Sequence, residues 1–148
     1  MKVLAENRRA RYEYFFHDQY EAGLSLQGWE VKSAKAANVS LAESFVHYQA
    51  EHGELWLKNA YFAPYTQGDV PNQDTKRNRK LLLHRHEIAK IAKAVQIAGR
   101  TCVPVKMVLT DGGLIKLTVA VASGKHAYDK KAVIKQRDIE REVRRTLS

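Results

Sequence analysis

The fold is decided by the stretch Val103-Pro104-Val105-Lys106-Met107-Val108-Leu109-Thr110-Asp111-Gly112-Gly113-Leu114-Ile115-Lys116-Leu117-Thr118-Val119-Ala120-Val121-Ala122. Two apolar, β-branched segments, 103–109 and 114–122, are separated by four residues that are typical of a hairpin turn. In the second segment every other residue from Ile115 to Val121 is apolar, which puts those side chains on one face and Lys116 on the other. The stretch therefore predicts two antiparallel strands with one buried face.

Other parts of the chain also have the patterns of strands. In residues 20–27 the even positions are apolar and the odd ones mostly polar, so a half-buried strand is predicted with Glu21 on its outer face. Segments 45–49 and 54–62 form a second predicted pair, joined through the turn at 51–53. Five or more short strands in about 120 residues predict a mainly β fold with helices, as a small closed or nearly closed barrel.

Helical patterns are fewer. Residues 87–98 carry apolar side chains at helical spacing, and Gly99 is a typical stop. A shorter helix is predicted near 30–37. Residues 68–78 are rich in Gly, Pro, Asn and Asp and predict a loop.

The charge of the chain indicates an anionic partner. The net charge is +9 with a pI near 9.7, and residues 76–100 hold eight Lys/Arg against one Glu. Nucleic acid is the first candidate for such a partner. An anionic membrane is disfavoured because no long amphipathic helix combines a basic face with an aromatic-rich apolar one. The sequence has no apolar run of membrane-spanning length and no signal-peptide pattern, and its single cysteine cannot form an internal disulfide, so we expect a cytoplasmic protein.

The basic segment supplies candidate RNA contacts. The cationic side chains expected to contact phosphate are Arg77, Arg79, Lys80 and Arg85. Leu82 lies among them, and two interpretations stay open: a core leucine, or an exposed side chain that packs on a sugar or a base edge. Glu21 is either a solvated strand carboxylate or an acceptor for a base amino group or a ribose hydroxyl.

The C-terminal residues differ from the rest. Residues 124–148 contain eight Lys/Arg and four Asp/Glu, and their apolar side chains make only a thin helical stripe. We therefore expect a body of residues 1–123 and a basic tail, 124–148, that is disordered when free and helical on a partner.

The sequence has no convincing catalytic group. The six histidines lack the spacing of metal ligands, and His84 and His86 would point to different faces of a helix. Cys102 sits among apolar residues and is expected to be a small core residue. We expect neither enzymatic activity, nor a cofactor, nor a bound metal.

Four motifs give the chain a specific resemblance. From about Asn7 to its end it closely resembles the SmpB family, bacterial proteins that bind transfer-messenger RNA. The motifs that carry the resemblance, in order along the chain, are Asn7-Arg8-Arg9-Ala10-Arg11-Tyr12-Glu13-Tyr14-Phe15, then Tyr20-Glu21-Ala22-Gly23-Leu24 with Gln27-Gly28-Trp29-Glu30-Val31-Lys32-Ser33, then Arg79-Lys80-Leu81-Leu82-Leu83-His84-Arg85, and Gly124-Lys125-His126-Ala127-Tyr128-Asp129-Lys130-Lys131.

The resemblance implies a fold and a function. The fold would be an oligonucleotide-binding (OB)-type β-barrel with about three helices and a basic C-terminal tail. The protein would bind the tRNA-like domain of transfer-messenger RNA as a monomer and, with EF-Tu and GTP, deliver it to stalled ribosomes for trans-translation. Its tail would occupy the empty mRNA channel at the 16S rRNA decoding centre, and it would not be an enzyme.

The resemblance also implies roles for individual residues. The RNA-contacting positions would be Glu21, Leu82, Lys116, Asn7 and Tyr14, and the basic arm adds Arg8, Arg9 and Arg11 as candidates. The ribosome-binding positions of the tail would be Gly124, Lys125, Tyr128, Asp129, Lys130 and Lys131.

The chain departs from the family pattern in the tail motif. His126 stands where the family usually has lysine. Lys131 stands where it usually has arginine, which keeps the charge but loses the planar guanidinium that makes bidentate contacts to rRNA. Two other functions stay open on the sequence: a generic basic RNA- or ribosome-binding protein and, less favoured, an RNA-processing enzyme.

Overall fold

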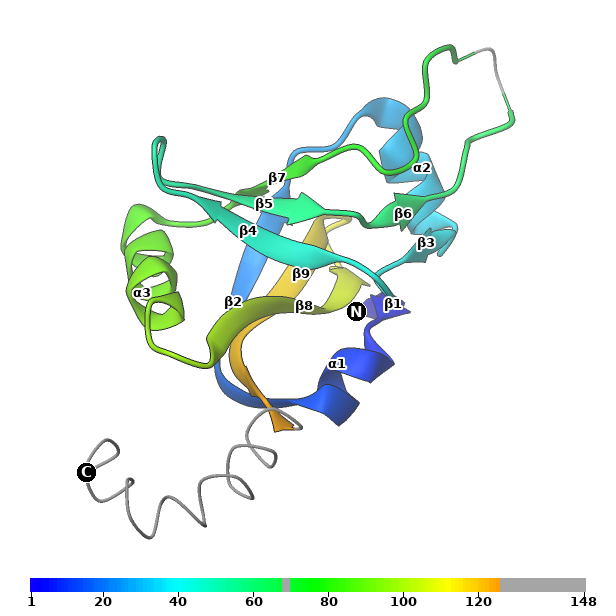
Figure 1. Ribbon diagram of the computed structural model, residues 1–148. Helices are drawn as coiled ribbons and strands as arrows, with labels where there is room; N and C mark the ends of the chain where they lie inside the picture. The colour runs from blue at the N-terminus through cyan, green and yellow to red at the C-terminus, as the bar shows by residue number, and fades with distance from the viewer. Residues whose placement is uncertain (68–69, 126–148) are drawn as a thin grey trace, which may run out of the picture.

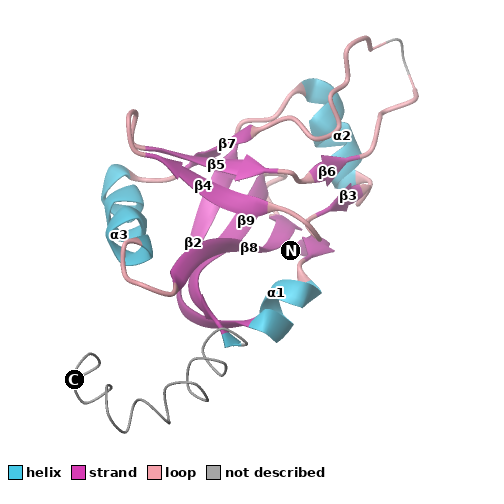
Figure 2. Cartoon of the chain, in the orientation of Figure 1, coloured by secondary structure: helices cyan, strands magenta, loops and turns pink. Residues whose placement is uncertain are grey.

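The computed structural model describes residues 1–67 and 70–125. Within them lie β1 (Lys2–Glu6), α1 (Arg8–Glu13), β2 (Tyr14–Leu24), α2 (Gly28–Lys35), β3 (Val39–Ser40), β4 (Phe45–Gln49), β5 (Glu54–Lys58), β6 (Tyr61–Phe62), β7 (Arg79–Leu82), α3 (Arg85–Val95), β8 (Arg100–Leu109) and β9 (Ile115–Gly124). The helices lie around a central body of strands (Figure 2).

Seven of these strands form one antiparallel sheet in the order β1-β8-β9-β2-β7-β5-β4, and β3 pairs with β6. The sheet curls over itself, so β4 contacts β8 although the two strands are far apart in the strand order (Figure 1). The prediction of a mainly β, barrel-like fold is confirmed. No helix in 1–67 and 70–125 is long and apolar enough to cross a membrane.

The predicted hairpin supplies β8 and β9, which are neighbours in this sheet. Leu109 pairs with Ile115, and the backbone N–H of Thr110 donates to the carbonyl of Leu114 at 2.8 Å. Gly113 has a φ of +85°, a conformation that glycine adopts without the steric cost of a side chain. Both strands extend beyond their predicted ends, which lengthens the contact between β8 and β9.

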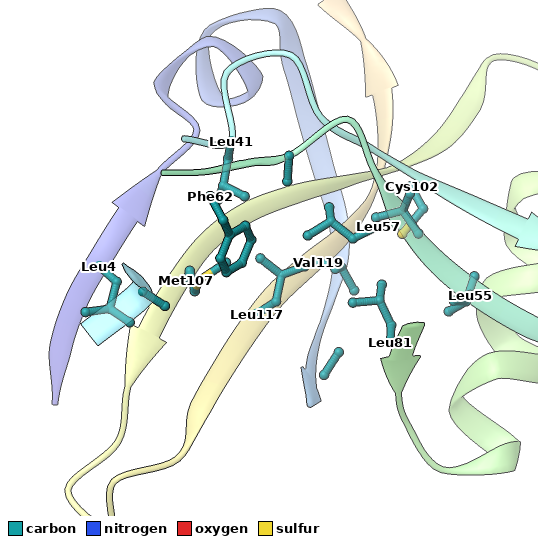
Figure 3. Close-up of a cluster of buried hydrophobic side chains, with 14 of the residues drawn as sticks. Leu4, Leu41, Leu55, Leu57, Phe62, Leu81, Cys102, Met107, Leu117 and Val119 are labelled. Carbon is teal, nitrogen blue, oxygen red and sulfur yellow. The ribbon is translucent and has the colours of Figure 1, made fainter. Parts of the chain in front are cut away.

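The core lies inside the curl of the sheet. Leu117, Val119 and Val121 of β9 are fully buried and, as predicted, belong to one cluster with Phe62 and Met107 (Figure 3). Burial of each large apolar side chain contributes about 1.5–3 kcal/mol. Cys102 is in the same core, where burial raises the pKa of its thiol to about 12, so the group stays protonated at neutral pH.

A second, smaller cluster lies on the opposite face of β8 and β9. There Ala10 of α1 packs against the buried side chains of Val103, Val105, Ala120 and Ala122. Helix α1 therefore covers one end of the outer face of the sheet, while β2, β9 and β7 leave Glu21 and Leu82 exposed further along.

Helices α2 and α3 begin earlier than predicted because a carboxylate in the first turn caps each of them. The backbone N–H of Gln27 donates to Glu30 at 2.7 Å, and that of His84 donates to Glu87 at 3.0 Å. Helix α3 thus begins at Arg85 and ends at Val95, and Gly99 follows with a φ of +82°. The described part of the predicted loop, 70–78, contains neither helix nor strand.

Candidate nucleic-acid interface

Three adjacent strands, β9, β2 and β7, bring three predicted RNA contacts onto one face. Gly23 of β2 pairs with Lys116 of β9 on one side and with Leu82 of β7 on the other. Two residues earlier, Glu21 pairs with Thr118. Paired residues of antiparallel strands project to the same side of the sheet, so Glu21, Leu82 and Lys116 share a face. We call this set the Glu21–Leu82–Lys116 face.

Leu82 is the apolar centre of this face. Its side chain is 51% exposed, whereas its neighbour Leu81 is 1% exposed and points into the core. The core interpretation of Leu82 is therefore wrong. A Cβ added at Gly23 would lie 3.3 Å from the Cβ of Leu82, so the glycine leaves the leucine room beside the strand. An exposed leucine flanked by a glycine, a lysine and a carboxylate can pack on a sugar or base edge.

Arg79 alternates with Lys80 along β7 and points inward, which contradicts its predicted role. It is fully buried, its Nε donates to Glu30 at 2.6 Å, and its Nη1 donates to the carbonyl of Ala60 at 2.7 Å. Its guanidinium also lies 4.1 Å from the ring centroid of Phe62. The expectation that Arg79 contacts phosphate is wrong because the side chain is buried and its Nε, Nη1 and Nη2 all donate to acceptors inside the protein.

Arg77 shares the carboxylate of Glu30 with Arg79. Its Nη2 donates to Glu30 and to the carbonyl of Ser25, and its side chain is 28% exposed. Burial alone raises the pKa of Glu30, but hydrogen bonds from Arg77 and the Gln27 backbone together with the charge of Arg79 outweigh it, so the pKa is lowered. Glu30 is thus ionised at neutral pH, and Arg77 has only part of its head group free for phosphate.

The other cations of the basic segment lie at the surface. Lys80 forms an ion pair with Glu54 at 2.9 Å and its side chain is 42% exposed. Arg85 is exposed in the first turn of α3. Both stay candidate phosphate contacts.

The arm before β2 is a short helix rather than an open segment. The side chain of Asn7 caps α1: its Oδ1 accepts from the N–H of Ala10 at 3.1 Å, and its Nδ2 donates to the carbonyl of Pro104 at 2.9 Å. At 5% exposure, with both polar atoms engaged, Asn7 holds α1 on β8. The expectation that the Asn7 side chain contacts RNA is therefore wrong, because both of its polar atoms are hydrogen-bonded inside the protein. Arg8, Arg9 and Arg11 are exposed on the same helix.

The end of β9 meets the beginning of β2. Tyr14 pairs with Gly124, so β9 continues one residue into the predicted tail. Lys125 follows, with its Nζ 5.1 Å from the ring centroid of Phe15 and 3.4 Å from the carbonyl of Arg11. The remaining predicted tail positions, Tyr128, Asp129, Lys130 and Lys131, lie outside the described residues, as does His126.

The histidines differ from expectation in one respect. His84 precedes α3 as its cap, so its ring stacks on that of His86, with the centroids 5.6 Å apart. The prediction that the two rings point to different faces of a helix is wrong for this reason. Among residues 1–67 and 70–125, no cluster of His, Cys, Asp and Glu could hold a metal ion.

Sequence analysis named neither Thr118 nor Lys106 as a candidate contact, although the alternation of the second hairpin segment puts Thr118 on the outer face with Lys116. Thr118 pairs with Glu21 on one side and with Lys106 of β8 on the other, so Lys106 lies in the same row as Glu21. The predicted hairpin contained the necessary signal for Thr118, but the irregular pairing between Pro104 and Lys106 changes the alternation of β8.

Comparisons with known proteins agree with this architecture. The family model described as "SmpB protein" matches residues 4–148. The SsrA-binding protein of Coprothermobacter proteolyticus is 51% identical over 98% of this chain and 96% of its own length. That of Ligilactobacillus salivarius is 46% identical over 98% and 92%, respectively. A solved structure described as "tmRNA-SmpB: a journey to the center of the bacterial ribosome" superimposes with a TM-score of 0.70 at 44% identity, covering 90% of this chain and 95% of the other. The chain belongs to the SmpB family.

Proposed function

We propose that this chain is an RNA-binding adaptor that binds the tRNA-like domain of transfer-messenger RNA and delivers it to stalled ribosomes in trans-translation. The relatives are named SsrA-binding proteins, and the solved structure is described by tmRNA, SmpB and the ribosome. The single observation that carries the proposal is the Glu21–Leu82–Lys116 face, where an exposed leucine, a carboxylate and a lysine converge from three strands.

The chemistry of this face suits a folded RNA better than an unstructured polyanion. Lys116 supplies a cation for phosphate, and Leu82 supplies an apolar surface for a sugar or base. Glu21 repels phosphate but accepts a hydrogen bond from a base amino group or a ribose 2′-hydroxyl. A face that mixes attraction and repulsion selects for RNA shape, whereas charge alone binds any sequence.

The proposal includes the finer parts implied by the sequence. The chain acts in the cytoplasm as a monomer, in a delivery complex with EF-Tu and GTP, and contributes no catalytic group of its own. Its C-terminal tail, with Gly124 and Lys125 at the start, occupies the decoding centre of the ribosome.

Competition between two RNAs tests the function. We expect the tRNA-like domain to bind much more tightly than an alanine tRNA of similar size at physiological salt, as measured by fluorescence anisotropy. Glu21→Ala and Lys116→Ala should each weaken binding to the tRNA-like domain with an unchanged circular dichroism spectrum, because both side chains lie outside the core. Equal binding of the two RNAs would refute the proposed specificity and favour a generic basic RNA-binding protein.

Removal of residues 132–148 tests the division of labour between barrel and tail. We expect the shortened protein to bind the tRNA-like domain with nearly unchanged affinity, since the proposed contacts to this RNA all precede residue 132. Tagging of a stalled peptide in a reconstituted translation system should be impaired. Normal tagging by the shortened protein would contradict the proposed role of the tail.

A further inference from the structure

A pocket lies at the other end of the outer face, where residues of α1 and the beginning of β2 contribute to its lining. Its lining includes three cationic, three aromatic and one amide side chain: Arg11, Lys106, Lys125, Tyr14, Phe15, Phe16 and Gln19. They come from α1, β2, β8 and the residue after β9, so the pocket exists only because these elements meet. We call it the α1 pocket.

The α1 pocket is continuous with the Glu21–Leu82–Lys116 face. Gln19 lies two residues before Glu21 on β2, and both point to the outer side of the sheet, since they pair with Ala120 and Thr118. Lys106 pairs with Thr118 from β8 and so lies in the row of Glu21. The outer side therefore runs without a break from Leu82 to the pocket.

The charges around the pocket favour an anion. Arg11 and Lys106 approach from α1 and β8, and Lys125 lies where it meets both the Phe15 ring and the Arg11 carbonyl. Two carboxylates are close by in the chain, and each has a cation of its own. Glu13 accepts from Arg9 at 3.0 Å, and Glu6, which pairs with Lys106 across β1 and β8, is 3.9 Å from Arg8.

We infer that the α1 pocket binds one unstacked nucleotide of single-stranded RNA, with the base against the rings of Tyr14 and Phe16 and the phosphate held by Lys106 and Lys125. Aromatic rings stack on any base, and neighbouring lysines neutralise the phosphate that follows it. Gln19 offers both a donor and an acceptor to a base edge. The inference rests on the proposed function in that the ligand is RNA, and it adds a second contact point away from Leu82.

The combination of groups distinguishes a nucleotide from an acidic peptide. An acidic peptide would contact the three cations but would leave the rings of Tyr14 and Phe16 without a planar group to stack on. A nucleotide uses both kinds of group. Competition by a peptide is therefore a test of the assignment.

A short oligonucleotide tests the pocket in the full-length protein. We expect titration of ¹⁵N-labelled protein with a single-stranded RNA tetranucleotide to shift the backbone amides of Gln19 and Lys106. In Lys106→Met, which keeps the apolar stem of the side chain, affinity should fall about five- to tenfold, and the slope of log K against log salt should decrease by about 1. The matched variant Lys90→Met, at an exposed position of α3, should change neither quantity.

Three results would overturn the inference. The first is a tetranucleotide that shifts only the amides around Leu82 and Lys116. The second is an equal effect of Lys90→Met and Lys106→Met. The third is displacement of the tetranucleotide by an acidic tetrapeptide at equal concentration. The tetranucleotide contains no tRNA-like fold. Failure of the α1 pocket to bind it would therefore leave the preference for the tRNA-like domain untouched, and loss of that preference would leave binding of the tetranucleotide untouched.

Discussion

Replacement of Glu30 by glutamine is expected to lower the free energy of unfolding by about 3–5 kcal/mol, which is the usual cost of removing one partner from a buried ion pair. Glu30 and Arg79 are both fully buried and joined at 2.6 Å, and Arg77 shares the same carboxylate. Glutamine has nearly the same shape but no charge, so it would leave the Arg79 guanidinium uncompensated in the interior. The loss should appear in urea unfolding followed by tryptophan fluorescence.

Glu54→Gln is the matched control for this effect. Glu54 also pairs with a cation, Lys80 at 2.9 Å, but the pair lies at the surface, and such pairs contribute about 1 kcal/mol or less. Equal losses of stability in Glu30→Gln and Glu54→Gln would show that burial of the Glu30 pair has no special importance.

The same carboxylate gives the protein an acid-sensitive contribution to stability. Because the pKa of Glu30 is lowered on folding, its contribution is present above the pKa of the unfolded chain and is lost as the pH falls through the lower pKa of the folded state. As the pH is lowered from neutral, the free energy of unfolding should therefore fall more steeply for the wild-type protein than for Glu30→Gln, which has no carboxylate to titrate at that position.

Leu82→Ala is expected to lower RNA affinity and Leu81→Ala to lower stability, although the two residues are adjacent. Leu82 is 51% exposed, so its loss should weaken binding to the tRNA-like domain about tenfold or more with little change in stability. Leu81 is 1% exposed in the core, so its loss should cost about 2–5 kcal/mol of stability. RNA affinity measured on the folded fraction of Leu81→Ala should stay close to that of the wild type.

Urea unfolding and RNA titration of both variants complete the test. If Leu82→Ala lost stability and kept its RNA affinity, Leu82 would be a packing residue and the Glu21–Leu82–Lys116 face would lose its apolar centre. If both variants lost RNA affinity equally, the face would depend on the general integrity of β7 rather than on one exposed side chain.

The strands of the β8–β9 hairpin could be predicted from the sequence because their signals are local, whereas β1, β3, β7 and the first half of β2 were not predicted as strands. Alternation placed Leu117, Val119 and Val121 on the core face, and the glycines after Asp111 marked the turn. The same alternation put Glu21 outside. These features depend on neighbours within a few residues, so tertiary packing did not alter them.

The buried cluster around Glu30 could not be predicted in the same way. Arg79 was grouped with the surface cations because the segment around it is rich in Lys and Arg. Its partner, Glu30, lies 49 residues away in the chain. A local signal did exist: Arg79 and Leu81 are two residues apart, so in a strand they share a face. Asn7 carried a similar signal, since an asparagine before a helical segment is a common cap. In both cases the function suggested by residue type concealed a structural role.

Strand β9 also sets a spacing between two parts of the molecule. It carries Lys116 near one end and Gly124 at the other, and both positions are fixed by pairing with β2. Eight residues of extended strand span about 26 Å, at roughly 3.3 Å per residue. Pairing with β2 thus holds Gly124, where the C-terminal segment begins, at a set distance from Lys116, the proposed RNA contact. An RNA seated at one end of β9 would thereby determine where that segment starts relative to whatever surface the complex approaches.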